Sequence, residues 1–308
     1  MKTKNRILVA GYSGMLGNSL IKLLNKNDKI FKISSKECDL TNQRKTLELI
    51  KKIKPTIIYL LAAKVGGIRA NIKKGAEFIY SNLMIVTNVV NAAKENNVKK
   101  LIYVGSSCVY PKNAPQPFKE NSLLTGELEK TNQYYAVAKI SGIKLIEAYN
   151  KYYGTSYLTV MPPNLYGPDD NFHKNNSHVL SALLKKFVTA KKRNLKKVSI
   201  WGSKNTLREF LFVDDLSNAL VFLKNKKLKK SIINVGSSKE ISIQSLAKKI
   251  AKYTKYKGKI EFDKNKPAGV KRKIMNSAYI KKLGWKPKVS LDEGIKKTLD
   301  WIEKKRLF

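Results

Sequence analysis

The sequence predicts an α/β fold, in which a doubly wound parallel sheet is followed by a smaller C-terminal α/β domain. In the first half of the chain, short β-rich apolar runs alternate with amphipathic helical patterns. This alternation stops after Pro162, where a loop rich in proline, asparagine and glycine begins. Repeated strand-helix units indicate a parallel sheet with helices on both faces. The length of 308 residues, 43% of them hydrophobic, suits one large domain and a smaller companion.

The expected elements divide the chain into two domains. The strands of the first half are predicted at 7–11, 29–34, 56–63, 100–107 and 157–161. The second half is predicted to contain a helix at 179–192, strands near 199–202 and 232–236, a segment 209–215 that leads into a helix, and a last helix at 291–305. We expect the first domain to comprise residues 1–163 with segments returning around 208–236. The substrate domain is expected to comprise 164–207 and 237–308.

The formal net charge of +40 comes mainly from lysine, since only seven of the 62 basic residues are arginines. Nucleic-acid-binding proteins concentrate arginine and basic stripes on one face. Here the lysines are spread over nearly every segment. We interpret them as a solvated surface whose positive field helps to capture an anionic small molecule. A non-catalytic nucleotide-binding or nucleic-acid-binding protein is the alternative that this charge keeps open.

The cysteines and the apolar runs indicate a cytoplasmic protein. Cys38 and Cys108 stand apart without metal-binding spacing, so we expect neither a metal site nor a disulfide framework. The apolar run 7–10 stops at a glycine, which argues against an export signal. The longest uncharged stretch, 78–93, contains too many polar residues to span a bilayer.

A glycine-rich turn follows the first predicted strand and opens a helix. It consists of Gly11, Tyr12, Ser13, Gly14, Met15, Leu16 and Gly17. Glycine allows the backbone to turn tightly and to approach a pyrophosphate, while the helix N-terminus offers free N–H groups and a partial positive charge. In this context the motif predicts a dinucleotide-binding site of the Rossmann type.

The end of the second predicted strand is expected to select the cofactor. An acid there would bind the ribose 2′-hydroxyl of NAD, whereas a cation would bind the 2′-phosphate of NADP. The strand ends in two serines followed by Lys36, so the sequence favours NADP, although Glu37 is adjacent. Asp39 and Leu40 are expected to contact the adenine, with a helix N-cap region as the alternative interpretation.

Tyr135 and Lys139 lie four residues apart in a helical segment, and therefore on one helix face. An ammonium group near a phenol is expected to lower the phenol's pKa, which makes proton exchange with a carbonyl oxygen practicable at neutral pH. Ser106 follows the fourth predicted strand at the carboxyl edge of the sheet, where ligands of open α/β sheets bind. The serine hydroxyl is suited to hold a substrate oxygen.

Several further motifs accompany these residues. They are Leu61–Gly67, Gly105–Pro111, Pro163–Pro168, Asp170–His173, Asn176–Val179 and Arg208–Phe210. With them, nearly the whole chain resembles the extended short-chain dehydrogenase/reductase family, and within it the enzymes that act on GDP-4-keto sugars. The resemblance implies that Ser106, Tyr135 and Lys139 form a reductase triad.

The resemblance also implies that Cys108 and His178 epimerise the sugar. A C4 ketone acidifies the hydrogens on C3 and C5, so a thiolate can remove one of them while a histidine returns a proton from the other face. This role requires the pKa of Cys108 to lie below the ordinary thiol value, which we expect neighbouring positive charge to provide.

Further binding residues follow from the same resemblance. The implied cofactor contacts outside the glycine turn and the second strand are Leu61, Ala62, Ala63, Lys139, Pro162, Asn164, Leu165 and His178. The implied substrate contacts are Ser107, Asn164, Val179, Lys186, Trp201, Arg208 and Asn276. The chain departs from the family where arginines often bind the 2′-phosphate, because it has Ser13 and Ser35 there, and Asn276 replaces a frequent aspartate.

The function expected from the resemblance is conversion of GDP-4-keto-6-deoxy-D-mannose by epimerisation at C3 and C5 and NADPH-dependent reduction at C4. One alternative is a C4 reductase of another GDP-4-keto sugar, such as a 6-deoxyheptose, without epimerase activity. Segment 78–93 is apolar on more than one side, so we expect it to pair with its copy and with the Tyr135 helix in a homodimer. A buried helix within one domain is the alternative for this segment.

Overall fold

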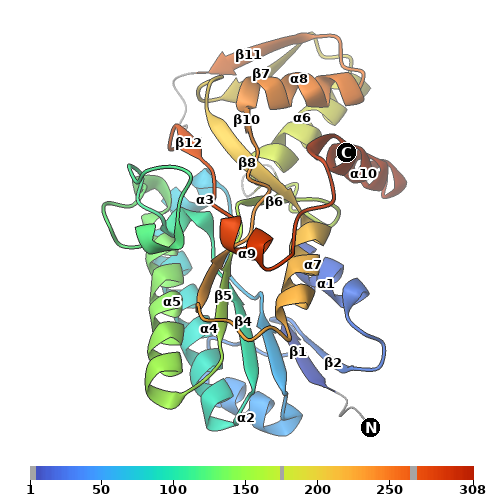
Figure 1. Cartoon of the computed structure of the whole chain (residues 1–308). Helices are drawn as coiled ribbons and strands as arrows, with labels where there is room; N and C mark the ends of the chain where they lie inside the picture. Colours follow the sequence, from blue (N-terminus) through green and yellow to red (C-terminus); the bar gives the residue numbers. More distant parts are fainter. Residues whose placement is uncertain (1–4, 174–176, 264–268) are drawn as a thin grey trace.

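The fold is centred on a six-stranded parallel sheet (Figure 1). The computed structural model describes residues 5–173, 177–263 and 269–308. The strand order is β2-β1-β3-β4-β5-β9, and all neighbours are parallel. The strands are β1 (Arg6–Ala10), β2 (Lys29–Ile33), β3 (Ile57–Leu60), β4 (Lys100–Val104), β5 (Leu158–Met161) and β9 (Ile232–Asn234).

Helices cover both faces of this sheet because its strands are apolar on both sides. Ile7 and Val9 of β1 face α1 (Met15–Leu23) and α7 (Val213–Leu223), which pack against each other. Leu8 and Ala10 face the opposite layer. That layer contains α2 (Gln43–Ile53), α4 (Gly75–Glu95) and α5 (Gln133–Tyr153). The predicted Rossmann-type doubly wound sheet is thus confirmed.

A second group of elements lies above the carboxyl edge of the sheet in Figure 1. Strand β8 (Leu207–Phe212) pairs with β6 (Asn164–Tyr166), β10 (Glu240–Ser242) and β12 (Arg272–Lys273). Strand β7 (Lys197–Trp201) pairs with β11 (Lys259–Asp263). The helices are α6 (Val179–Lys192), α8 (Ile243–Tyr253), α9 (Ala278–Lys282) and α10 (Leu291–Lys304). Residues of α6, α8, α10 and β8 share a separate apolar core.

The structure differs from the prediction where the chain leaves the central sheet. The third and fourth strands end at Leu60 and Val104, earlier than expected. Residues 61–67 and 105–106 form neither helix nor strand, and they are followed by α3 (Ile68–Lys73) and the short helix η1 (Ser107–Val109). Strand β8, expected within a segment returning to the first domain, pairs only with strands of the second group among the described residues. The division into domains stays a proposal.

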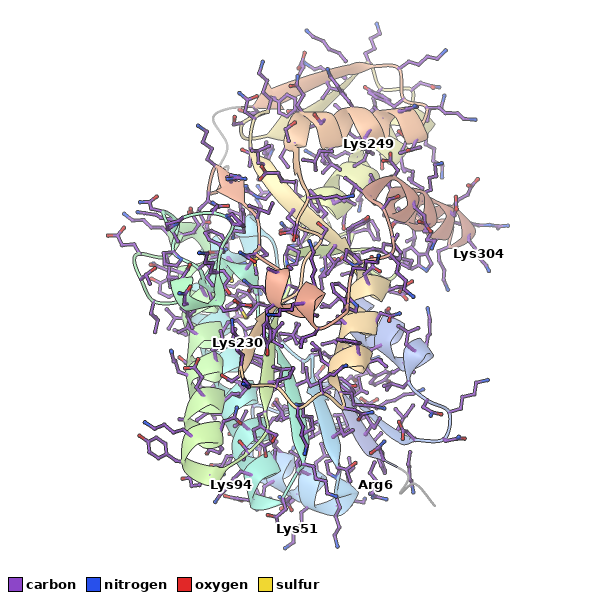
Figure 2. All side chains as sticks on the ribbon, viewed as in Figure 1. Arg6, Lys51, Lys94, Lys230, Lys249 and Lys304 are labelled. Carbon is purple, nitrogen blue, oxygen red and sulfur yellow. The ribbon has the colours of Figure 1, made fainter. Side chains whose placement is uncertain are left out.

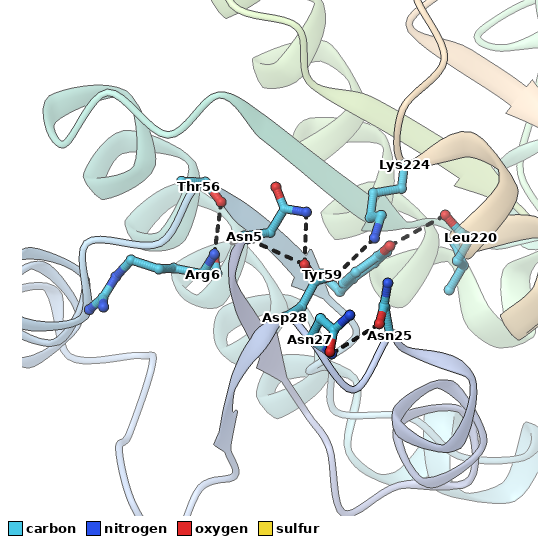
Figure 3. A network of polar contacts seen from close by, with 9 residues as sticks. All are labelled: Asn5, Arg6, Asn25, Asn27, Asp28, Thr56, Tyr59, Leu220 and Lys224. Atoms are coloured by element: carbon cyan, nitrogen blue, oxygen red, sulfur yellow. Dashed lines mark hydrogen bonds and ion pairs between the residues drawn. The ribbon is translucent and has the colours of Figure 1, made fainter. Parts of the chain in front are cut away.

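A polar network at the amino edge of the sheet joins β1, β2 and α7 (Figure 3). The Asp28 carboxylate accepts a hydrogen bond of 2.9 Å from the Asn5 amide and forms a 3.1 Å ion pair with Lys224. Both side chains of the pair are less than a tenth exposed. Burial raises the pKa of Asp28, but the contacts with Asn5 and Lys224 outweigh it and hold this pKa below its ordinary value. The network therefore fixes the edge of the sheet that lies opposite the glycine turn.

The positive charge is distributed over the whole molecule. In Figure 2, Arg6, Lys51 and Lys94 lie at the lower end of the view, Lys249 lies in the upper part, and Lys304 lies at the right-hand margin near mid-height. This distribution agrees with a solvated lysine-rich surface and does not concentrate the charge in one basic stripe. None of the described helices is both long and apolar enough to cross a membrane. Asn176, the first residue of one sequence motif, lies outside the described residues.

Candidate active site

The glycine turn is tightly packed on one side and open on the other. Gly11 has a φ of +91°, and a side chain there would place its Cβ 2.6 Å from the backbone nitrogen of Ala62. A Cβ on Gly17 would overlap the backbone oxygens of Gly11 and Tyr12. Gly14, the N-cap of α1, is exposed, and the nearest atom to a Cβ there would be 3.7 Å away. The open space beside Gly14 and the N-terminus of α1 thus fit a pyrophosphate.

The remaining residues of the turn are accessible from the same side. Tyr12, Met15 and Leu16 are half-buried, and Ser13 is exposed. On the other side, Leu61, Ala62 and Ala63 are half-buried where the chain leaves β3. The backbone nitrogens of Leu61 and Ala62 donate to the Ala10 oxygen at 2.9 and 2.8 Å. These bonds hold the end of β3 against the turn.

The tip of β2 carries one cation and one anion. Lys36 is exposed. The Glu37 carboxylate turns back toward the strand and accepts hydrogen bonds from the hydroxyl and the backbone nitrogen of Ser34, the latter at 2.7 Å. These bonds lower the pKa of Glu37. Asp39 accepts bonds from Thr41, while Leu40 is buried in the core. The N-cap of α2 is Asn42, so the N-cap role considered for the Asp39 region belongs to a later residue.

Tyr135 and Lys139 of α5 lie at the carboxyl end of β4. Lys139 is buried, and its ammonium group donates a 2.8 Å hydrogen bond to the backbone oxygen of Val104, two residues before Ser106. The same nitrogen lies 4.6 Å from the ring centroid of Tyr103 and 5.7 Å from that of Tyr135. Burial lowers the pKa of Lys139 to about 8. Lysine, tyrosine and strand end are therefore brought together as predicted.

The protonation of Tyr135 differs from the sequence prediction. Burial raises the pKa of this phenol well above its ordinary value, with further increases from Cys108 and Tyr103. The expected lowering by Lys139 is not found, because loss of hydration dominates the environment of the hydroxyl group. Tyr135 is therefore a neutral phenol at physiological pH, which is the form that can donate a proton.

Cys108 lies in η1, directly after the strand-end serine. The Ser106 hydroxyl accepts a 3.4 Å hydrogen bond from the Cys108 backbone nitrogen, and the Cys108 side chain is buried. Burial raises the pKa of the thiol, while Lys273, Ser106 and Lys139 oppose this increase without overcoming it. The expectation of a thiol pKa below the ordinary value is therefore wrong for the protein without ligands. The neighbouring positive charge that the expectation required is nevertheless present.

The other residues around η1 and the start of α6 are also positioned by local contacts. Ser107 is buried, and its backbone nitrogen donates to the oxygen of Pro162 at 3.1 Å. His178 is the half-buried N-cap residue of α6, which begins at Val179. The electrostatic partner of His178 is Asp170, whose pKa is raised by burial and lowered in part by His178. His178 is thus close enough to Asp170 to act on its carboxylate.

The predicted substrate residues come from the second group of elements. Arg208 of β8 is half-buried, and burial lowers its pKa to about 10, with a smaller opposing effect from Glu129. Lys186 of α6 donates to the Ser199 oxygen at 2.7 Å, and burial lowers its pKa. The two cations come from different elements, α6 and β8.

Trp201 and the two asparagines complete the predicted set. Trp201 is 43% exposed, and the guanidinium carbon of Arg69 lies 5.2 Å from its ring centroid. Asn164 donates to the backbone oxygen of Glu209 at 3.0 Å. The Asn276 side chain accepts a bond of 3.0 Å from the Ala278 nitrogen. Leu165, next to Asn164 in β6, is half-buried.

Comparison with known proteins identifies the family. Residues 7–236 match the model of the NAD dependent epimerase/dehydratase family. The chain belongs to this family. It is 45% identical to GDP-L-fucose synthase 1 of Arabidopsis thaliana over 302 residues, which cover 97% of this chain and 93% of that protein. The family assignment confirms the resemblance to extended short-chain dehydrogenases/reductases.

Two solved structures are similar over nearly the whole chain. A GDP-6-OMe-4-keto-L-xylo-heptose reductase from C. jejuni superposes with a TM-score of 0.91 at 33% identity, covering 99% of both chains. A GDP-L-fucose synthetase from Naegleria fowleri bound to NADP superposes with a TM-score of 0.90 at 27% identity, covering 99% of this chain and 96% of that one.

Four residues that interact with predicted site residues of this epimerase/dehydratase family member were not identified from the sequence. They are Tyr103, Glu129, Arg69 and Lys273. Lys273 is one of many lysines and lies in a two-residue strand, so no local pattern distinguishes it. Arg69, by contrast, follows the Leu61–Gly67 motif closely and belongs to a scarce residue type in this chain. Across the described residues, no cluster of histidine, cysteine or acidic side chains is suited to hold a metal ion.

Proposed function

We propose that the protein is an NADPH-dependent enzyme that converts GDP-4-keto-6-deoxy-D-mannose to GDP-L-fucose by epimerisation at C3 and C5 and hydride reduction at C4. The observation that carries this proposal is the position of Lys139 and Tyr135 at the carboxyl end of β4, on the same sheet edge as the glycine turn. The 45% identity to a GDP-L-fucose synthase supports the choice of substrate.

The residues at the sheet edge fit NADP. The turn Gly11–Gly17 and the N-terminus of α1 would hold the pyrophosphate, and Lys36 would contact the 2′-phosphate. Leu61–Ala63, Asp39, Leu40, Lys139 and Pro162–Leu165 would line the remaining cofactor surface. When bound, NADPH supplies the hydride for C4.

The reductase step uses the groups around β4. The neutral Tyr135 phenol donates a proton to the C4 oxygen as that oxygen becomes an alcohol. The Ser106 hydroxyl holds the same oxygen. Lys139, charged at pH values below about 8, stabilises the phenolate that Tyr135 leaves behind. Each group is thus in the protonation state that reduction requires.

The epimerase step uses Cys108 and His178. In its thiolate form, Cys108 removes a proton from C3 or C5, and the enolate oxygen rests on Tyr135 and Ser106. His178, at the N-terminus of α6, is proposed to supply the proton on the opposite face. Cys108 in η1 and His178 at the start of α6 are held by different elements, and we propose that the sugar lies between them.

The GDP portion is assigned to the second group of elements. Lys186 and Arg208 are suited to the diphosphate, and Trp201 offers a partly exposed aromatic face. Ser107, Asn164, Val179 and Asn276 are proposed as further substrate contacts. An Arg208→Ala variant tests this assignment. Reduced activity with NADPH binding retained supports it, whereas an unchanged KM for the GDP-sugar opposes it.

We further propose a cytoplasmic homodimer. Packed helices α4 and α5 expose large side chains, including Tyr80, Tyr134 and Tyr152, which are each at least half exposed. A second copy would cover this surface. A dimer mass in light scattering that falls to the monomer mass after Tyr80→Lys substitution supports the dimer. A monomer mass for the unmodified protein at micromolar concentration contradicts it.

Product identification tests the proposed function. Purified protein is incubated with NADPH and GDP-4-keto-6-deoxy-D-mannose, and the product is identified by NMR. GDP-L-fucose is the expected product. Oxidation of NADPH that yields only a C4-reduced manno sugar would contradict the epimerase assignment, and no oxidation with any GDP-4-keto sugar would contradict the enzyme assignment.

The similarity to the heptose reductase favours one alternative, a C4 reductase of another GDP-4-keto sugar. Reaction in D₂O distinguishes the two activities. Epimerisation exchanges the hydrogens on C3 and C5 with solvent, so the product carries deuterium at both positions. Two results together support the alternative. The reduced product carries no deuterium at C3 and C5, and a 4-keto-heptose is reduced faster than the mannose derivative.

A further inference from the structure

Strand β12, which carries Lys273, lies beside β8 in the second group of elements. Its two residues run parallel to β8, with Lys273 paired to Arg208. On the other side, the Gln116 side chain donates to the oxygen of Arg272 at 2.8 Å and accepts from the nitrogen of Ile274 at 3.0 Å. The position of Lys273 is therefore fixed from both sides.

The residues directly after Lys273 are equally constrained. Phe118 donates to the Ile274 oxygen at 2.9 Å and accepts from the Asn276 nitrogen at 2.9 Å. The nitrogen of Met275 donates to the fully buried carboxylate of Glu209 at 2.7 Å. Phe118 and Met275 also belong to the same apolar cluster as Cys108. Phe118 also stacks on Tyr110, two residues after Cys108, with ring centroids 5.1 Å apart. Backbone bonds thus hold the residues after Lys273 against the segment that follows the cysteine, independently of any charge on Lys273.

The charged groups around Lys273 come from three elements. Cys108 lies in η1, Arg208 lies in β8, and Glu129 directly precedes the short helix η3 (Lys130–Asn132). Burial lowers the pKa of Lys273; Cys108 and Glu129 raise it, and Arg208 lowers it further. Glu129 thus compensates part of the positive charge that Arg208 and Lys273 bring together.

Two cations act on Cys108, and they are engaged differently. Lys273 has the larger effect on the thiol, and Lys139 has the smaller one. Lys139 is already bonded to the Val104 oxygen and lies over the rings of Tyr103 and Tyr135. Those two phenols also interact electrostatically with Cys108. Because Lys139 is already bonded among the groups of the reductase step, we assign the main interaction with the Cys108 sulfur to Lys273.

We propose that Lys273 is a positioning residue for epimerisation, whose ammonium group stabilises the anionic sulfur of Cys108. This inference rests on the proposed function, in which Cys108 is the carbon base. The thiolate gains the proton, the electron pair of the C–H bond enters the enolate, and the negative charge moves from sulfur to the C4 oxygen. Lys273 keeps its own protons throughout, so removing its charge lowers the fraction of Cys108 that is present as thiolate without affecting hydride transfer.

Titration of the cysteines tests the inference directly. Protein labelled with ¹³C at cysteine Cβ gives one NMR signal for Cys108 and one for Cys38, the only other cysteine. In Lys273→Met, the Cys108 midpoint should rise by about one pH unit or more, since a nearby opposite charge has an effect of this order. Lys273→Arg should largely restore it. An unchanged Cys108 midpoint in Lys273→Met would overturn the proposal.

Two controls separate this effect from a change in structure. Lys271→Met removes an exposed lysine two residues away and should leave the Cys108 midpoint unchanged. Cys38, whose charged neighbours are Asp39 and Lys45, should titrate alike in all variants. A shift of both cysteines in Lys273→Met would indicate a global change and would count against the proposal. Should that variant fail to fold, Lys273→Gln provides the same charge removal with a polar side chain.

Isotope exchange tests the catalytic consequence. Without NADPH, incorporation of deuterium from D₂O into C3 and C5 of the keto sugar should fall about tenfold in Lys273→Met, as expected for a tenfold smaller thiolate fraction. Reduction of the already epimerised ketone should stay within about twofold of the unmodified enzyme. Equal losses in exchange and reduction would contradict the assignment. Failure of the unmodified protein to exchange would refute the proposed function, whereas the NMR titration would still decide the Lys273–Cys108 interaction.

Discussion

The three glycines of the turn should respond differently to alanine substitution, although the sequence presents them as one motif. Gly11 and Gly17 have no space for a Cβ, because it would meet backbone atoms of Ala62 in one case and of Gly11 and Tyr12 in the other. Gly14 has free space on its outer side. We therefore expect Gly11→Ala and Gly17→Ala to affect folding and Gly14→Ala to affect cofactor binding.

The magnitudes follow from these contacts. A side chain at positive φ costs about 1–2 kcal/mol, and an overlap in a packed interior costs about 1–3 kcal/mol. Gly11→Ala should accordingly lower the free energy of unfolding by at least about 2 kcal/mol, equivalent to a Tm decrease of roughly 4 °C or more. Gly14→Ala should change Tm by less than about 2 °C. The methyl group of Gly14→Ala would stand where the pyrophosphate approaches the backbone. Loss of a hydrogen bond to a charged phosphate costs about 1.5–3 kcal/mol, so the Kd of this variant for NADPH should rise roughly tenfold to a hundredfold.

Differential scanning fluorimetry without cofactor and NADPH fluorescence titration measure the two effects separately. Two results would refute the reasoning: a Gly14→Ala variant that binds NADPH like the unmodified protein, or a Gly17→Ala variant that is equally stable. The first result would mean that the turn does not approach the pyrophosphate at Gly14, and the second that the packing around Gly17 is not as tight as its contacts indicate.

Three further predictions concern the catalytic groups and the sheet edge. Tyr135→Phe should reduce the rate of C4 reduction by at least about a hundredfold while leaving NADPH affinity within about twofold, because it removes only the proton donor; unchanged turnover in a stopped-flow assay would exclude this role. The rate of reduction should fall as pH rises through about 8, because Lys139 then loses its proton, and Lys139→Arg, if it retains activity, should abolish this decrease; a rate that stays constant to pH 10 would contradict it. Asp28→Asn should destabilise the fold by about 3 kcal/mol at pH 7, because Lys224 loses its buried partner. Since the folded pKa of Asp28 is lowered, this stabilisation is present above about pH 4 and is lost as pH falls through the folded value; equal denaturation midpoints at pH 7 for both proteins would refute it.

The inner strands of the central sheet were predictable because they are buried on both faces. Such strands are continuous apolar runs, and the positions of β1, β4 and β5 follow directly from them. The edge strand β2 carries two exposed lysines and was recognised from its β-rich alternation. Helix α6 matches the predicted bounds 179–192, since its apolar periodicity begins after a histidine N-cap and ends in two lysines. The proximity of Tyr135 and Lys139 was likewise predictable from helical spacing.

The electrostatic character of the site could not be derived from sequence. Spacing predicts that Lys139 and Tyr135 are close, but not that burial outweighs their interaction and keeps the phenol protonated. The orientation of the Glu37 carboxylate toward Ser34 depends on a turn whose backbone is set by the tertiary structure. The interaction proposed between Lys273 and Cys108 depends on the pairing of β12 with β8 and with the 116–118 segment, contacts that span more than 60 residues of chain.

The most direct test of the account follows the hydride. Protein is supplied with GDP-4-keto-6-deoxy-D-mannose in H₂O and with NADPH deuterated at the transferred position of the nicotinamide ring, and the product is examined by NMR. The account predicts GDP-L-fucose with deuterium at C4 and hydrogen at C3 and C5. Product without deuterium at C4, or a deuterated product that retains the manno configuration at C3 and C5, would contradict it.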